Sequence, residues 1–323
     1  MKRSHLGILP FMNEHVPFLQ KLQSLRKAVP MYVFITGITP HAWIKVKQNL
    51  HLAPDTDEID VVLNSSGGSA EDAYRMIRTF REKYYTVNVI VPFWAKSAAT
   101  LFAFGANRLV LHECGELGPI DAQIPKDDER DPEAWSSALD VQSSVAEIEK
   151  RSREGMLEMF TLMRGGENSE IVRIGRKALA EMLLDYSAKF YAPLLQKIEP
   201  MEMGQRARVL NVGKMYARRI LKQYNSTTTD KQIEELLYFL VYECPDHGYV
   251  VDHQILRSFL PFVLKADQAP FGLEYYKTLG SLALFLMEKE WPNINDFLSS
   301  FAPQTTPSTM EVPVPPVAGE QNE

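Results

Sequence analysis

The chain has 323 residues, of which 45% are hydrophobic and 24% charged, and its formal net charge at pH 7 is −6. This composition is that of a globular protein, and the length suits one large core with an appended segment. The acidic balance excludes general nucleic-acid binding, which needs a basic surface. Its cysteines, Cys114 and Cys244, lack the spacing of a metal or redox motif, so we expect a reducing compartment, the cytoplasm.

The lengths of the apolar runs and the spacing of the histidines exclude further classes of protein. The longest apolar runs, at residues 98–106 and around 282–287, are far shorter than the roughly 20 residues that cross a membrane. Residues 1–29 lack the apolar core of a signal peptide. No metal site and no cofactor are expected, because these histidines are scattered without ligand spacing: His5, His15, His41, His51 and His112.

The first motif joins a strand to a helix through a pair of glycines. Residues 59–63 form a β-branched run, Asn64-Ser65-Ser66-Gly67-Gly68 follows as a turn, and residues 69–84 have helical apolar spacing. Glycines lack a Cβ, so their backbone can approach a ligand and present N–H groups to it, as an oxyanion hole requires. The plain alternative is a turn that only connects strand to helix.

The second motif places a serine at the start of a helix. Residues 87–91 form a strand, and an uncharged helical stretch runs from Ser97 to Gly105. Because serine is a preferred N-cap, a purely structural role for Ser97 stays open. In the functional interpretation its hydroxyl stands where the helix dipole and the N–H of Ala98 stabilise negative charge. Lys96 is expected to face solvent or to pair with a carboxylate.

The third motif follows a short strand at residues 109–111. In the order Ser-Ser-Gly-Gly-Ser, Ala-Lys-Ser-Ala-Ala-Thr and Glu-Leu-Gly-Pro-Ile-Asp-Ala-Gln, the motifs resemble the serine dehydrogenase proteinase family. That family is a branch of the Clp-protease/crotonase fold that also includes the signal-peptide peptidases. The resemblance covers residues 30–265 and implies an α/β fold, a Clp/crotonase-like spiral of repeated β-β-α units with appended C-terminal helices.

The same resemblance implies an acyl-transfer site. Ser97 matches the nucleophile, and the amides of Gly68 and Ala98 match the oxyanion hole. The residues expected to bind substrate are Gly67, Gly118 and Pro119.

The family is described as using a Ser, Asp, His triad in that chain order, and Asp121 is the matching aspartate. His247 fits the base best, because residues 245–252 resemble the His-Gly-Tyr-Pro-Ile segment of relatives, with Val250 in place of the usual proline. His253 is the alternative. A base must take the serine proton, and a third group holds that base in one tautomer. The alternative is that neither residue is catalytic: Asp121 would only cap its turn, and His247 would only lie in a loop before a strand at 249–251.

A lysine base is a second enzymatic alternative. Signal-peptide peptidase relatives use a Ser/Lys dyad, and Lys150 lies at a plausible separation from Ser97. A desolvated lysine can act as a base at neutral pH. The charged neighbours Glu147, Glu149 and Arg151 argue against this, because they indicate a solvated helix face.

Four segments are expected along the chain. They are an N-terminal helical segment at 1–29, the peptidase domain at 30–265, a C-terminal helical segment at 266–302 and a disordered Pro/Thr/Ser-rich tail at 303–323. Inside the domain, a charged loop at 127–132 precedes helices at 141–164, 169–198, 202–224 and 231–243, with a glycine break at 165–168.

We therefore expect a soluble serine endopeptidase that acts on peptide or protein substrates as a homo-oligomer. An unfoldase or adaptor partner is kept open. Two alternatives come from other classes. A crotonase-type acyl-CoA enzyme shares the oxyanion hole but does not need Ser97, and a catalytically silent oligomeric scaffold needs neither.

Overall fold

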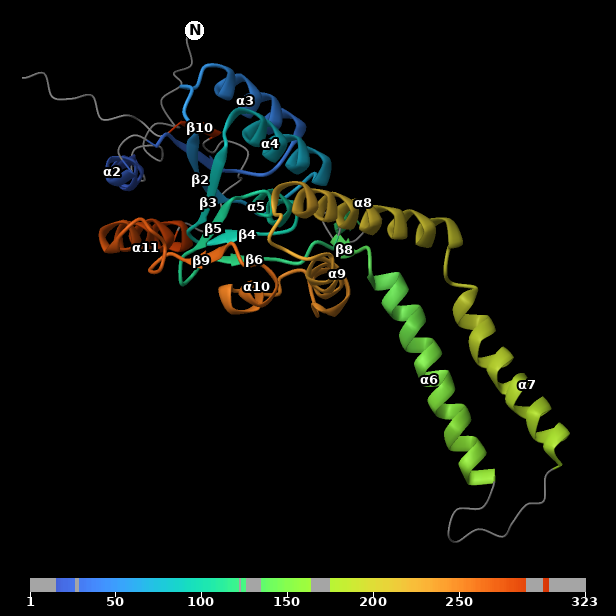
Figure 1. Cartoon of the computed structure of the whole chain (residues 1–323). Helices are drawn as coiled ribbons and strands as arrows, with labels where there is room; N and C mark the ends of the chain where they lie inside the picture. The colour runs from blue at the N-terminus through green and yellow to red at the C-terminus, as the bar shows by residue number, and fades with distance from the viewer. Residues whose placement is uncertain are drawn as a thin grey trace, which may run out of the picture.

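A largely parallel sheet organises the fold (Figure 1). The computed structural model describes residues 16–26, 29–121, 123–125, 135–163, 175–288 and 299–301. The sheet has the order β10-β1-β2-β3-β5-β9, in which β10 pairs antiparallel with β1 and the other neighbours pair in parallel. Its strands are β1 (Met31–Ile35), β2 (Glu58–Asn64), β3 (Thr86–Val91), β5 (Arg108–Leu111), β9 (Val263–Lys265) and β10 (Ser299–Phe301).

Helices cover both faces of the sheet, which explains why its strands are apolar runs rather than alternating patterns. Val61 and Leu63 of β2 point to one face, where they join a core with α3 (Pro40–His51), α4 (Ala70–Lys83) and α5 (Ala98–Ala103). Val62 points to the other face, which is covered by α2 (Val16–Arg26) and α11 (Leu273–Glu288). The segments before and after the predicted peptidase domain therefore pack together on one face of its sheet.

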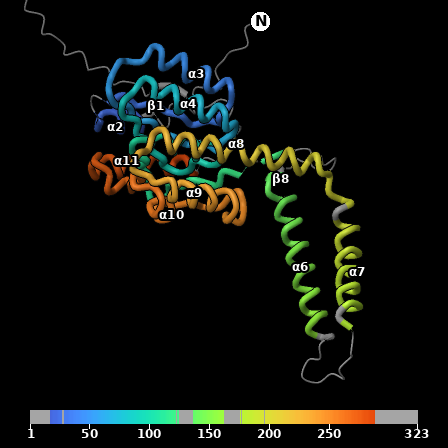
Figure 2. The backbone as a smooth tube through the Cα atoms, turned by 45° about the vertical axis from the view of Figure 1, so that its right-hand side comes forward, coloured from blue at the N-terminus to red at the C-terminus, as the bar shows by residue number. Residues whose placement is uncertain are grey.

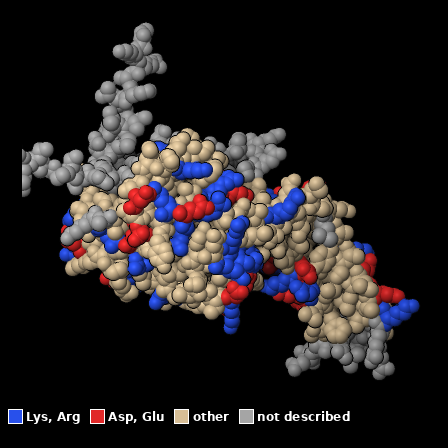
Figure 3. All heavy atoms as spheres, turned by 45° about the horizontal axis from the view of Figure 1, so that its top comes forward, with Lys and Arg blue, Asp and Glu red and all other residues tan. Residues whose placement is uncertain are grey.

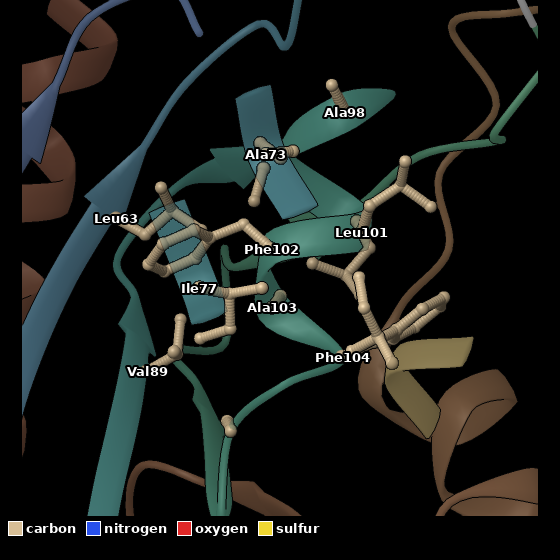
Figure 4. Packing of buried hydrophobic residues seen from close by; sticks show 14 of the residues in the cluster. Leu63, Ala73, Ile77, Val89, Ala98, Leu101, Phe102, Ala103 and Phe104 are labelled. Carbon is tan, nitrogen blue, oxygen red and sulfur yellow. The ribbon is translucent and has the colours of Figure 1, made fainter. Parts of the chain in front are cut away.

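The core behind the nucleophile motif is closely packed. Figure 4 shows Phe102 of α5 lying beside Ile77 of α4, with Leu63 of β2 and Val89 of β3 next to them. All these side chains are 0–1% exposed. Close packing fixes side chains in place, so α5 holds the turn before it rigidly.

A second layer of short pairings follows the long strands. Here β4 (Trp94–Ala95) pairs in parallel with β6 (Glu116–Leu117), and single bridges join Ile38 to Gly68, Ser65 to Ala95 and Leu117 to Val251. Along the chain, β1, β2 and β3 are each followed by such a short stretch and then by a helix. This is the β-β-α repeat that the sequence predicts, and the motif turns lie in its second layer.

A long helical hairpin projects from this body. The strands β7 (Gln123–Pro125) and β8 (Trp135–Ser137) pair at its base, and α6 (Asp140–Met163) and α7 (Arg176–Leu195) extend away from the sheet (Figure 2). α8 (Pro200–Tyr224) then returns to pack against α4 and α5. The chain continues through α9 (Asp230–Tyr238), a π-helix (Phe239–Glu243) and α10 (His253–Phe259) to β9.

The predicted α/β fold, with Clp-like parallel strands followed by helices, is confirmed. The strand predicted at residues 249–251 is wrong: Val251 forms a single bridge with Leu117, because Tyr249 is held in a turn by its N–H bond to the carbonyl of Asp246. The helix predicted at 231–243 changes to π geometry after Tyr238. The charged loop at 127–132, the glycine break at 165–168 and the tail at 303–323 lie outside the described residues.

Surface charge is mixed on the face that Figure 3 shows, where Lys and Arg side chains are interspersed with Asp and Glu. On α8, Arg218 pairs with Glu234 at 2.5 Å and Lys222 pairs with Asp230 at 2.9 Å. The basic residues of this helix are thus partly neutralised, as on an ordinary solvated face. None of the described helices combines the length and the apolar content that crossing a bilayer requires.

Candidate active site

The glycine turn after β2 has a conformation and surroundings that require glycine. Gly67 and Gly68 have φ angles of 105° and 136°, which L-residues with side chains rarely adopt. A Cβ on Gly67 would lie 2.8 Å from Cβ of Ser97, and one on Gly68 would lie 2.2 Å from the carbonyl oxygen of Ile38. The turn therefore lies directly against the nucleophile motif, as the interpretation of an oxyanion cradle requires.

Ser97 sits on a strained turn between β4 and α5. Its φ is 51° and its ψ is −118°, and among the described residues no other non-glycine residue has a positive φ. Although Ser97 occupies the N-cap position of α5, its side chain makes no capping hydrogen bond, so the N-cap interpretation does not account for this serine. Strain of this kind is stored at functional turns, including the strand-to-helix turns that expose serine nucleophiles.

Two backbone N–H groups face the same region without a carbonyl acceptor. Ala98 is the first residue of α5, where an amide has no acceptor within its helix. Within the part of the chain that the structure describes, neither the Ala98 N–H nor the Gly68 N–H donates to a backbone carbonyl, whereas the Gly67 N–H donates to Ser65 Oγ at 3.1 Å. The Gly68 and Ala98 amides are thus available to an oxyanion.

An aspartate and a histidine from distant parts of the chain form a buried pair. Nδ1 of His247 lies 2.7 Å from Oδ1 of Asp121, across 126 residues of sequence. The Asp121 side chain is 7% exposed and that of His247 is 29% exposed. Burial by itself raises the pKa of Asp121, but hydrogen bonds from His247 and Ser137 outweigh it and hold this pKa below its usual value. Asp121 is therefore an ionised acceptor that fixes the imidazole orientation.

Ser137 completes the surroundings of Asp121, and sequence patterns did not single it out. Its hydroxyl donates to Oδ2 of Asp121 at 2.7 Å, and its own carbonyl accepts from Nη1 of Arg206 at 3.0 Å. The same guanidinium nitrogen donates to Oγ of Ser136 at 3.0 Å. Arg206 lies on α8 and Ser137 ends β8. The base of the hairpin is therefore bonded to the Asp121–His247 pair.

The glycine turn, the Ser97 turn and the Asp121–His247 pair line one cavity of about 600 Å³. Its volume is within the range of ligand pockets, which is on the order of 300–1,000 Å³. The lining residues that matter for the chemistry are Gly67, Gly68, Ser97, Ala98, Asp121 and His247. Since Nδ1 of His247 is occupied by Asp121, Nε2 is the ring nitrogen that is left for another partner.

Lys96 is buried and paired with a carboxylate, which is the second of the two environments expected for it. Its Nζ lies 2.5 Å from Oε1 of Glu116, and the Lys96 side chain is 11% exposed. The ammonium also donates to the carbonyls of Gly248 and Tyr249, at 3.4 Å each. Lys96 thus ties the nucleophile turn to the loop that carries His247.

Most of the other predicted residues do not line the central cavity. Lys150 is exposed on α6 of the projecting hairpin (Figure 1). His253 lines a separate cavity together with His112 and Lys265. Gly67 lines the central cavity, but Gly118 and Pro119 are not among the lining residues in the part of the chain described. The reason is that Gly118 packs behind the site, where a Cβ would lie 2.6 Å from Cδ of Lys96.

Comparison with known families agrees with this geometry. Residues 20–131 match the model of the ClpP-like SDH-type serine proteinases. The predicted resemblance is confirmed for that segment. It contains β1 to β6 with the glycine turn and Ser97, whereas His247 lies beyond it.

Individual relatives are more distant. Two uncharacterized proteins of Methanocaldococcus jannaschii are 29% and 27% identical over 96 residues, which is 30% of this chain and 32% of each relative. The chain thus matches about a third of the length of these curated relatives. A ClpP1 structure from Listeria monocytogenes is 23% identical, with a TM-score of 0.27 over 32% of this chain and 59% of that one. The 1510-N membrane-bound stomatin-specific protease is 14% identical, with a TM-score of 0.30 over 50% of this chain and 70% of that one.

Proposed function

We propose that the protein is a serine endopeptidase that uses Ser97 as nucleophile, His247 as general base and Asp121 as the residue that orients it. The amides of Gly68 and Ala98 form the oxyanion hole. The observation that carries the proposal is the Asp121–His247 contact of 2.7 Å at the cavity that Ser97 lines. The family match at residues 20–131 supports the serine peptidase class.

The proposed reaction begins with attack of Ser97 Oγ on the carbonyl carbon of a peptide bond, while the hydroxyl proton passes to Nε2 of His247. The C=O π electrons move onto oxygen, where the N–H groups of Gly68 and Ala98 stabilise the negative charge. When the carbonyl re-forms, the C–N bond breaks and the leaving amine takes the proton from His247. Water then attacks the acyl-Ser97 ester by the same proton route and releases the acid.

The surroundings of the lysines favour histidine over a Ser/Lys dyad. Lys150 is exposed on the hairpin, and a solvated ammonium keeps its proton at neutral pH. Lys96 is next to the nucleophile in sequence, but its ammonium contacts Glu116 and the carbonyl oxygen of Leu117, and Lys96 is not among the described residues that line the cavity. The Lys96 side chain is therefore engaged in structural contacts with Glu116 and the backbone.

The remaining predictions about function concern class and partners. A crotonase-type acyl-CoA enzyme would use the Gly68 and Ala98 amides without needing Ser97, and a silent scaffold would leave the strain at Ser97 without a purpose. A peptide or protein substrate, a homo-oligomer and an unfoldase or adaptor partner stay predictions.

A fluorophosphonate probe with Ser97→Ala and Ser66→Ala variants tests the proposal. Ser66 is the matched control, because it also lines the cavity but is not on the strained turn. We expect the probe to label the wild type and Ser66→Ala at one serine, Ser97, identified by peptide mass. Ser97→Ala should lose labelling and roughly 10⁴-fold or more of its peptidase activity. Its circular dichroism spectrum should be unchanged.

Two outcomes would contradict the proposal. Peptidase activity in Ser97→Ala close to that of the wild type would exclude Ser97 as nucleophile. A wild type that neither reacts with the probe nor cleaves any peptide would favour the scaffold alternative.

A further inference from the structure

The cavity at Ser97 has an apolar wall. This wall comes from α5, from the turn before Asp121 and from α8, and it consists of Leu101, Ile120, Val209, Val212 and Gly213. At Gly213, a Cβ would lie 3.3 Å from the carbonyl oxygen of Ile120, so glycine lets the helix approach the turn closely. Such a wall accommodates an apolar side chain, because apolar lining gains free energy when it is removed from water.

One further carboxylate lines the cavity, apart from the apolar wall and the Asp121–His247 pair. Glu71 lines it from the first turn of α4, and among the described lining residues there is no lysine or arginine. The polar contact of Glu71 within the described residues is long: Ser69 Oγ donates to Oε2 of Glu71 at 3.4 Å. Apart from Asp121, which is bonded to His247 and Ser137, Glu71 is the only acidic lining residue among those described.

The nearby arginine does not neutralise Glu71. Arg75 stands one helical turn beyond Glu71, the spacing at which Glu and Arg side chains commonly pair. Instead, its Nη1 pairs with Oδ1 of Asp72 at 2.7 Å. Asp72 is 2% exposed. Because Arg75 is paired with Asp72, Glu71 has no ion pair among the described residues. The cavity therefore carries an uncompensated negative charge, which favours a cation.

The position of Glu71 brings that charge within reach of a bound peptide. Gly67 contacts the Ser97 turn and lies four positions before Glu71, so their backbones are at most about 14 Å apart. An extended peptide advances about 3.3 Å per residue. Residues close to the scissile bond can thus present a long cationic side chain to Glu71 while a neighbour occupies the apolar wall.

We propose that Glu71 selects substrates in which a Lys or Arg side chain lies within a few residues of the scissile bond, next to an apolar residue that occupies the wall formed by α5 and α8. This inference rests on the proposed peptidase function and adds a substrate class to it. Glu71 acts here as a specificity residue, and the chemistry stays with Ser97.

Matched fluorogenic peptides test the inference. In an apolar background, single positions on either side of the scissile bond carry Lys, Gln or Glu, and kcat/KM is measured for the wild type, Glu71→Gln and Glu71→Lys. We expect the wild type to prefer Lys over Glu by about tenfold or more at one position, as a charge pair of moderate burial allows. Glu71→Gln should abolish this preference, and Glu71→Lys should reverse it. Added salt should weaken it.

A variant on the same helix is the control. Glu82 lies near the end of α4, pairs with Arg78 at 2.8 Å and lines a different groove. Glu82→Lys introduces the same charge change, and it should leave the Lys-over-Glu preference within about twofold of the wild type.

The outcomes distinguish failure of this inference from failure of the proposed peptidase function on which it rests. If the wild type and every Glu71 variant cleave the Lys, Gln and Glu peptides equally while Ser97→Ala cleaves none, the peptidase stands and the role of Glu71 is overturned. A preference that persists unchanged in Glu71→Lys overturns it as well. If no peptide is cleaved and the fluorophosphonate does not label Ser97, the peptidase function fails and the substrate class fails with it.

Discussion

The sheet body and the α6–α7 hairpin differ in what stabilises them. In the body, β2, β3 and β5 bury nearly all their side chains between helical layers. In the hairpin, Leu157 is 65% exposed and Leu184 is 70% exposed, and the ion pairs are exposed pairs within one helix. Burial of apolar surface therefore holds the body together, whereas helix propensity and weak local pairs hold much of the hairpin.

This difference shows where a rigid site can be built. Ser97, Asp121 and His247 all belong to the body, where packed neighbours restrict their motion. The hairpin reaches the site through its base, where Ser137 of β8 donates to Asp121. We expect changes in the body to cost activity or stability heavily, changes in the hairpin arms to cost little, and changes at the base to lie between.

The largest contrast is expected among the three candidate bases. His247→Ala in the body should lower kcat/KM by roughly 10⁴, on the scale of other triad substitutions. Lys150→Ala on the hairpin arm should leave it unchanged, and so should His253→Ala, which affects a separate cavity.

Measurement of kcat/KM for all three variants and the wild type at pH 7 checks this contrast. An active His247→Ala enzyme together with an inactive Lys150→Ala enzyme would replace the histidine with the lysine. If instead His253→Ala were inactive and the other two were active, the base would be His253.

The second contrast compares two lysine–carboxylate pairs. Lys96→Met in the body leaves the carboxylate of Glu116, 19% exposed, without its cation, and breaking a pair that is largely buried costs about 3–5 kcal/mol of unfolding free energy. Lys189→Met on α7 removes a pair with Asp185 that is 2.7 Å long but 76% and 61% exposed, and no measurable change is expected. Urea unfolding of both variants at pH 7 measures the difference. Equal losses would remove the distinction between body and hairpin.

The smallest of the three contrasts is expected at the base of the hairpin, where Ser137→Ala is compared with an exposed serine of α6. Ser137→Ala removes one hydrogen bond to Asp121 and should cost about 1–2 kcal/mol of unfolding free energy at pH 7. Because the folded-state pKa of Asp121 is lowered, its stabilising effect is present above the unfolded pKa, near 3.9, and is lost as pH falls through the folded value. Without Ser137 this pKa is lowered less, so the loss begins near the same unfolded pKa but is smaller and is complete at a higher pH.

Urea unfolding of Ser137→Ala and the wild type between pH 7 and pH 3 measures this dependence. The difference between the two proteins should shrink as the pH falls. Ser144→Ala, an exposed serine on α6, is the control and should show no difference at any pH. A Ser137→Ala difference that is constant with pH would mean that its hydrogen bond does not favour the ionised form of Asp121.

Sequence patterns predicted most of the body because its signals are local. Short apolar runs, the glycine turn and helical apolar spacing predicted the positions of β2, α4, β3 and β5. The order of the motifs along the chain indicated the fold. The geometry at Ser97 was only partly accessible, since serine at a helix start fits both an N-cap and a nucleophile. Its positive φ and its missing capping bond appear only in three dimensions.

The residues that the sequence did not reveal act across long distances in the chain. Ser137 belongs to a short strand without a motif, and its contact with Asp121 depends on how β7 and β8 pair. Burial of Lys96 depends on a loop 152 residues later. The charge at Glu71 is left uncompensated because Arg75 pairs with Asp72, a choice between neighbouring carboxylates that spacing alone does not decide.

The separation of Asp121 and His247 by 126 residues also bears on how the protein is made. During synthesis the nucleophile turn and the glycine turn leave the ribosome long before the base, and one sheet face stays uncovered until α11 arrives to pack with α2. Contacts between such distant segments form late in folding, because closing long loops costs entropy first. Under the proposed mechanism, a nascent chain carries Ser97 without its base, and hydrolytic competence coincides with completion of the fold.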